Sequence, residues 1–149
     1  MRLYLRPCPP SEAILTRLAG VPGFNLTRGL AVLPGKTARY LALLGDFVES
    51  QTNHMVRLAE LLAAGDHTRA HRLAHSLKGA AATLGAERLS ESARGLETIF
   101  RLYPDAALLD DTTRAKILVD LQAINFELEA LRHALSSHSH EASHDRHSR

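Results

Sequence analysis

Residues 116–135 read KILVDLQAINFELEALRHAL, and their apolar residues are regularly spaced. These apolar residues recur at steps of four, three, four, three and four, and they are Ile117, Leu121, Ile124, Leu128, Leu131 and Leu135. Residues three or four positions apart lie on one face of an α-helix, which makes 3.6 residues per turn. The stretch therefore predicts a long amphipathic helix that starts near Asp110 or Asp111 and buries one face.

Three earlier stretches have the same period. The first, about Lys36 to Ala64, has a stripe of Leu41, Leu44, Val48, Met55, Leu58 and Leu62. The second has a stripe of Ala70, Leu73, Leu77, Ala80, Ala81 and Leu84. The third, about Glu87 to Tyr103, has Leu89, Ala93, Leu96, Ile99 and Phe100. Each stripe predicts a helix that packs one face against a common core.

The boundaries of these helices carry recognisable signals. Gly65 is a natural C-terminal residue for the first, and Asp66 is a natural N-cap for the second, which stops at Gly85. Pro104 closes the third helix. Two shorter helices are expected upstream. One follows a possible cap at Ser11 and ends at Gly20 and Pro22, and the other runs from a cap at Asn25 to Pro34-Gly35.

Four long amphipathic helices joined by short connections predict an all-α, up-down-up-down four-helix bundle with short N-terminal helices. The chain has 149 residues, the size of one domain, and 45% of them are hydrophobic. We expect a leader or linker over 1–10, the bundle over 11–136, and a disordered C-terminal tail over 137–149, which is polar and His-rich.

Composition excludes several classes of function. The single cysteine, Cys8, rules out an internal disulfide and a Cys-based zinc site, and it favours a cytoplasmic setting. The formal net charge of +2, with scattered Lys and Arg, argues against nucleic-acid binding. There is no run of 18 apolar residues, so we expect no contact of this chain with a membrane.

The chemistry gathers on the second long helix. At about 100° per residue, with Leu73 at zero, the apolar arc is centred near 40° and His75 lies near 200°, away from the core. The same outward strip carries His71, Lys78, Gly79 and Ala82. A core role for His75 is therefore excluded, and an exposed imidazole with an ammonium three residues on predicts a docking place for a phosphoryl group.

Gly79 supports this interpretation. Glycine within a helix costs about 1 kcal/mol relative to alanine, and on an exposed face internal packing does not explain that cost. Close approach of another surface to His75 would explain it. A neutral imidazole, whose ordinary pKa is about 6.5, is an adequate nucleophile near neutral pH without a strong activating base.

The run His75-Ser-Leu-Lys78-Gly79, followed by five residues and Gly85, resembles the H-x-L-K-G-x5-G signature of histidine-containing phosphotransfer (HPt) domains. The likeness covers about residues 14–103 and is to the HPt segment that ends many bacterial hybrid sensor kinases; the fourth helix fits in length only. It implies a four-helix bundle without catalytic power of its own, in which His75 carries a phosphoryl group between receiver-domain aspartates. The Pro-rich leader and the likeness favour a piece of a hybrid kinase over a free-standing protein.

The resemblance also implies partners and further site residues. Receiver domains of a hybrid kinase or of a response regulator would supply the aspartate and Mg²⁺, because the sequence shows no carboxylate cluster of its own and thus predicts no resident cofactor. Glu97 matches the position whose side chain bonds the imidazole nitrogen that is not phosphorylated, or else it is a solvated glutamate. Arg101, one turn on, is expected either near the site or as an idle surface residue.

Two other functions stay open at this point. One is a helical scaffold or dimerisation module without phosphorylation, although His75 is present. The other is a metal site, because His71 and His75 have the i, i+4 spacing with which one helix face can hold an ion, although no third ligand is evident. The tail histidines, His138, His140, His144 and His147, could also bind a metal adventitiously.

Overall fold

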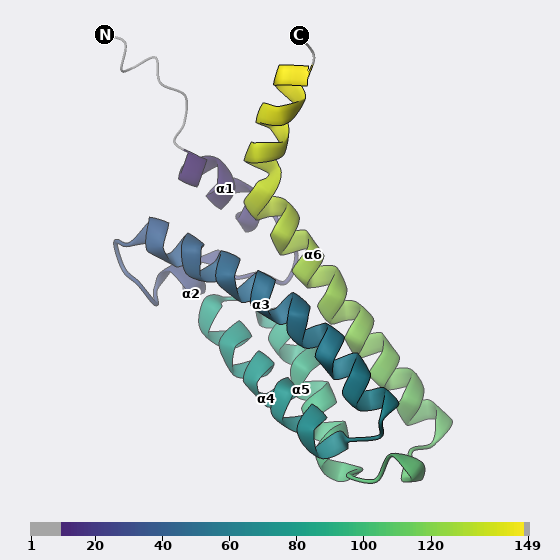
Figure 1. Ribbon diagram of the computed structural model, residues 1–149. Helices are drawn as coiled ribbons and strands as arrows, with labels where there is room; N and C mark the ends of the chain where they lie inside the picture. Colours follow the sequence, from purple (N-terminus) through teal and green to yellow (C-terminus); the bar gives the residue numbers. More distant parts are fainter. Residues whose placement is uncertain (1–9, 148–149) are drawn as a thin grey trace, which may run out of the picture.

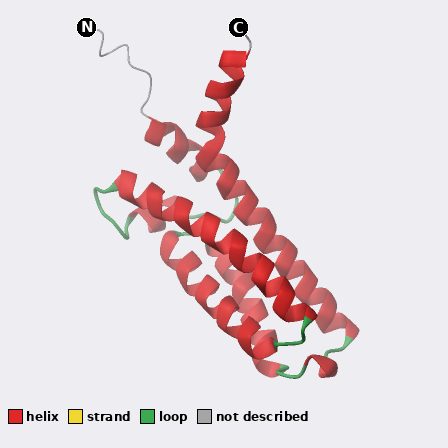
Figure 2. Cartoon of the chain, in the orientation of Figure 1, coloured by secondary structure: helices red, strands yellow, loops and turns green. Residues whose placement is uncertain are grey.

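The computed structural model describes residues 10–147 of the chain, with side chains over 11–136. The elements follow one another along the chain as α1 (Pro10–Ala19), α2 (Leu26–Leu30), α3 (Thr37–Ala63), α4 (His67–Leu84), α5 (Glu87–Leu102), the 3-10 turn η2 (Ala106–Leu108) and α6 (Asp111–His147). Figures 1 and 2 show these helices joined by short loops. The expected all-α bundle with two short N-terminal helices is confirmed.

Helices α3 to α6 form the bundle, and their neighbours define its order. Helix α4 packs against α3 and α5, and α6 packs against α5 and α3, so α4 and α6 lie on opposite corners (Figure 1). The short connections make successive helices antiparallel, as in an up-down-up-down bundle. Helix α1 packs on the C-terminal half of α6, where Arg17 donates to the Ala134 carbonyl, and α2 packs on the C-terminal end of α4.

The core lies along the axis of this bundle and is mostly leucine and alanine. Its largest fully buried side chains are Tyr40, Phe100, Leu18, Leu44, Leu58, Leu89, Leu96, Ile124 and Leu131. Full burial of one such side chain stabilises the fold by about 1.5–3 kcal/mol. The small residues Ala70, Ala74, Ala81 and Ala93, all fully buried, allow α4 and α5 to approach closely. That close approach brings the side chains at the α4–α5 seam into contact.

The predicted ends of α3, α4 and α5 and the predicted start of α6 are confirmed within one or two residues. Helix α2 follows its predicted cap Asn25 but ends at Leu30, before the predicted terminator Pro34-Gly35, because the chain turns over residues 31–35. Gly65 and Gly85 follow α3 and α4 with φ of +73° and +95°, a left-handed conformation that glycine adopts at little cost. The side chain of Asp66 accepts a hydrogen bond from the Arg69 backbone N–H (3.1 Å), as an N-cap does. Asp110 caps α6 in the same way, accepting from the Thr113 N–H at 2.7 Å.

The C-terminal end of α4 is pinned by α2 and α3. The Tyr40 hydroxyl donates to the Leu84 carbonyl at 2.7 Å in a buried position, and burial raises the pKa of Tyr40 to about 12. Gly29 of α2 packs so closely here that a Cβ would collide with the Tyr40 hydroxyl and the Leu84 carbonyl. Helix α4 is therefore held rigidly at one end, which fixes the residues that it displays.

The two ends of the chain differ in part from what the sequence predicts. Ser11 is not the cap of α1, because that helix already begins at Pro10; proline suits a first helical turn since it has no N–H to leave unpaired. The tail, expected to be disordered, continues α6 as helix to His147; no Pro or Gly interrupts residues 137–147. Of the predicted leader over 1–10, Pro10 is the first residue of α1, and residues 1–9 lie outside the described residues.

Candidate functional site

Helix α4 presents His75 to solvent, although the helix is rotated slightly from the expected orientation. Ala74 is fully buried, whereas Leu73 and Ala80 are only partly buried, so the core face is centred closer to Ala74 than the apolar stripe predicts. The His75 side chain remains 65% exposed. In this orientation α4 packs more extensively against α5 than against α3.

Glu97 of α5 lies directly beside His75. Its Oε2 is 2.6 Å from the His75 Nδ1, and the Glu97 side chain is only 14% exposed. Because an ionised carboxylate can only accept hydrogen bonds, Nδ1 is the protonated ring nitrogen in this pair. In a neutral imidazole the other nitrogen, Nε2, then carries the free lone pair. The sequence-predicted partner of the imidazole is thus in contact with it.

Lys78 contacts the same carboxylate from one turn along α4. Its Nζ is 2.6 Å from Glu97 Oε1, so the two carboxylate oxygens are divided between the lysine and His75. The hydrogen bond from Lys78 is the main cause that lowers the pKa of Glu97, opposed by burial and assisted by the bond to His75. Glu97 is therefore an anion at neutral pH. The sequence placed Lys78 on the outward strip, but its side chain is only 28% exposed and lies against α5.

His71 adds a second imidazole to this cluster. Its Nε2 is 3.8 Å from Glu97 Oε2, the oxygen that His75 uses. The rings of His71 and His75 are nearly parallel, with their centroids 6.5 Å apart. His71 is partly buried, so it flanks the more exposed imidazole along the helix.

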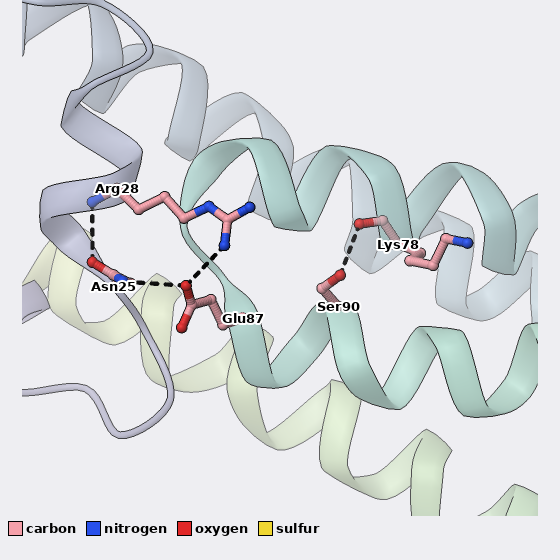
Figure 3. A network of polar contacts seen from close by, with 5 residues as sticks. All are labelled: Asn25, Arg28, Lys78, Glu87 and Ser90. Atoms are coloured by element: carbon pink, nitrogen blue, oxygen red, sulfur yellow. Dashed lines mark hydrogen bonds and ion pairs between the residues drawn. The ribbon is translucent and has the colours of Figure 1, made fainter.

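Sequence reasoning missed one residue that supports the site, Ser90. This buried serine of α5 donates from its hydroxyl to the backbone carbonyl of Lys78 at 3.0 Å (Figure 3). The bond ties the turn of α4 that follows His75 to α5. A polar residue at a buried helical position was the only signal in the sequence, because its partner lies twelve positions away.

Gly79 and Ala82 continue the exposed face toward the C-terminal end of α4. A Cβ built on Gly79 meets no atom within 4 Å, so packing inside the bundle does not require glycine there.

Ala82 is partly buried and lines a surface hollow together with Arg28, Arg88, Ser90 and Arg94. Arg28 is held at this hollow by Glu87, which also accepts from Asn25 (3.1 Å each; Figure 3). Arg101 is exposed one turn beyond Glu97.

Neither a metal cluster nor a membrane-spanning helix is found in the described part of the chain. Within it, no group of three or more His, Cys, Asp or Glu side chains is arranged to hold a metal ion. Among the same residues, no helix combines the length and the apolar character needed to cross a membrane.

The fold and the site together define a helical bundle that displays one carboxylate-bound imidazole on its surface. The family model described as "Hpt domain" matches residues 42–136, and the chain therefore belongs to the Hpt family. Comparison with curated proteins gave no match, and neither did comparison with solved structures. Membership in the family gives the chain its function, which is histidine phosphotransfer in a phosphorelay, and Hpt domains generally interact with receiver domains.

Proposed function

We propose that His75 is the phosphoacceptor of this domain and that its Nε2 forms the bond to phosphorus. The observation that carries the proposal is the 2.6 Å contact between His75 Nδ1 and Glu97 on a ring that is 65% exposed. One nitrogen is held by the protein, and the ring as a whole remains accessible. A neutral imidazole with its lone pair on Nε2 is a competent nucleophile near pH 7.

The proposed step exchanges one bond to phosphorus for another. The Nε2 lone pair attacks the phosphorus of a receiver aspartyl phosphate, the N–P bond forms, and the P–O bond to the aspartate breaks. The aspartate leaves as a carboxylate with the electron pair. The proton on Nδ1 stays on the ring, where the Glu97 carboxylate offsets the positive charge that develops on the imidazole. Reversal of the step on another receiver passes the phosphoryl group on.

Lys78 has a supporting role in this proposal. Its ammonium keeps Glu97 ionised and in place by occupying Oε1, which leaves Oε2 for His75. The same positive charge, three residues from His75 on one helix, favours an anion attached to the imidazole. Lys78 would thus act in two ways: it would stabilise the phosphoryl group directly, and it would hold the Glu97 carboxylate that orients His75.

The receiver would dock over Gly79 and Ala82, with His71 and Arg101 at the edges of the contact. Open space at Gly79 lets a partner approach the backbone one turn from His75. Phosphoryl transfer needs in-line placement and charge neutralisation, and we propose that the receiver, of a hybrid kinase or a response regulator, supplies both the aspartate and Mg²⁺. The domain itself would then be a carrier. The reducing setting that Cys8 favours is consistent with a cytoplasmic exchange.

The test is transfer from a phosphorylated receiver, followed by mass spectrometry for an acid-labile adduct. The wild-type chain should carry one phosphoryl group on His75. His75→Gln should fold, bind the receiver and accept none, whereas His71→Gln, one turn away in the same cluster, should keep at least partial transfer. If the label persists in His75→Gln and disappears in His71→Gln, the assignment of the acceptor is wrong.

A further inference from the structure

Helix α6 has an apolar outer face in addition to the face that it buries. Leu118, Val119 and Phe126 are 59%, 57% and 67% exposed. At about 100° per residue they fall within an arc of about 100°, opposite the buried Ile124 and Leu131. Single exposed apolar residues are ordinary, but three large ones on one helical face, together with the exposed Ala115, form a patch of the kind that marks an interaction site.

This patch, formed by Ala115, Leu118, Val119 and Phe126, lies away from the phosphotransfer site. Helix α6 packs against α1, α3 and α5, and it occupies the corner of the bundle diagonally opposite α4, which carries His75 (Figure 1). A receiver docked over α4 would leave the α6 patch uncovered. The patch therefore calls for a different partner.

The charges around the patch match those of a second α6 in the antiparallel direction. If Gln122, which is exposed, lies on a two-fold axis, residues equally far from it on either side face each other across the axis. Leu118 then faces Phe126 of the other copy, and Asp111 faces the other copy's His133, whose ring can donate a hydrogen bond to the carboxylate. Arg114 comes next to Glu129 of the other copy, which is 68% exposed and pairs through its Oε1 with Arg132 of its own chain.

The parallel arrangement lacks this complementarity. It would place Asp111 against Asp111 and Arg114 against Arg114, and like charges in such positions are unfavourable. An antiparallel pair also gives an isologous contact, in which the same patch serves both copies and the assembly closes at two. Apolar side chains near the centre and polar or charged side chains toward the rim are the usual composition of a protein interface.

We propose that the chain forms a homodimer through antiparallel contact of two α6 helices centred on Gln122. The dimer displays its two His75 sites on opposite outer faces, so each copy can meet a receiver independently. The apolar residues supply the binding free energy, and the charged residues set the direction of the pair.

The first test is sedimentation velocity of the full chain over a wide range of concentration. The mass should rise from one chain to two as concentration increases. Phe126→Asp should shift this transition to at least tenfold higher concentration while the helical circular dichroism signal and phosphate acceptance stay unchanged. Val56→Asp is the matched control, because Val56 is 60% exposed on α3, and it should dimerise like the wild type.

Several outcomes of that test would overturn the proposal. They are a single-chain mass at every concentration, a dimer that Phe126→Asp leaves intact, and a dimer that Val56→Asp weakens equally. If the wild type stays a single chain and Phe126→Asp unfolds, another segment of the same chain, such as residues 1–9, covers the patch and the dimer is wrong. If the wild type stays a single chain and Phe126→Asp binds the receiver less tightly than the wild type does, the patch belongs to the receiver interface.

The second test fixes the direction of the helices. In a Cys8→Ser background, Gln122→Cys should cross-link two chains under mild oxidation, because residues on the axis of a helix pair come within disulfide range. Ala115→Cys should not, since its two copies would be about 21 Å apart along antiparallel helices at 1.5 Å per residue. Cross-linking at both positions would indicate a parallel pair, and cross-linking at neither would show that α6 does not meet α6.

Discussion

The imidazole Nδ1 of His75 and the carboxylate Oε2 of Glu97 are 2.6 Å apart across the seam between α4 and α5. The two residues are 22 positions apart in the chain, and Glu97 is shared with Lys78. Because α4 is tied to α5 by Ser90 and pinned at its end by Tyr40, this distance is held by the bundle and does not depend on a flexible loop.

Replacement of Glu97 should slow phosphotransfer without unfolding the domain. Glu97→Gln removes the charge that offsets the imidazolium, and loss of a hydrogen bond to a charged group costs about 1.5–3 kcal/mol, or about ten- to a hundredfold in rate. Transfer kinetics from a phosphorylated receiver measure the rate, and ¹⁵N NMR of His75 should show less of the Nδ1–H tautomer. Glu60→Gln, exposed on α3, is the control and should change neither. An unchanged tautomer in Glu97→Gln would contradict the positioning role.

The stability that Glu97 contributes should depend on pH in a definite direction. Its pKa is lowered in the folded protein, chiefly by the hydrogen bond from Lys78, so the folded state favours the ionised form. This contribution is fully present above the unfolded value of about 4.5 and is lost as the pH falls through the lowered folded value. Urea unfolding of wild type and Glu97→Gln across this range should therefore give curves that converge in acid. If the unfolding free energies of the two proteins diverge toward low pH, the stabilising contribution of Glu97 does not depend on its ionised form.

Substitution of Gly79 should separate stability from docking. Gly79→Ala should stabilise the domain by about 1 kcal/mol, because the added Cβ meets open space and alanine favours helix. Gly79→Gln should also fold at least as well as the wild type, but its bulk should hold a receiver away from His75 and slow transfer. Thermal unfolding and transfer kinetics measure the two effects. If Gly79→Gln transfers as fast as the wild type, close approach is not the reason for this glycine.

The glycine in α2 should behave in the opposite way. Gly29→Ala forces a Cβ against the Tyr40 hydroxyl and the Leu84 carbonyl, and overpacking of this kind costs about 1–3 kcal/mol. Gly45→Ala in α3 is the matched control, since its Cβ meets no atom within 4 Å and should stabilise by about 1 kcal/mol. Urea midpoints of the two variants should move in opposite directions from that of the wild type.

Removal of residues 137–149 should leave the bundle intact. Among the described side chains, Ala134 is the last that is buried in the core, and the apolar stripe of the sequence ends at Leu135, so we expect truncation after Ser136 to remove no core contact. The thermal midpoint should stay at the wild-type value, and the helical signal should fall at most by the share of the removed turns. A clear drop in the midpoint would show that the end of α6 packs on the bundle.

Features that depend on neighbours within about four residues could be predicted from the sequence. Asp66 caps α4 through Arg69, and Gly65 and Gly85 end their helices with positive φ, because these interactions are complete within one turn. The exposure of His75 also followed from its angle on the helix, since one strong apolar stripe is enough to orient a helix roughly.

The contacts between α4 and α5, by contrast, depend on how the whole bundle packs. No pattern within either helix shows that Lys78 turns toward Glu97, that Ala74 is buried more deeply than Leu73, or that Ser90 bonds the Lys78 carbonyl. These contacts join residues twelve or more positions apart, and the rotation of a helix by a few tens of degrees depends on which side chains of its neighbours fill the gap between them. Even the prediction that Glu97 bonds the imidazole rested on a family resemblance. The residues of one helix do not specify which carboxylate of the next helix will reach an imidazole.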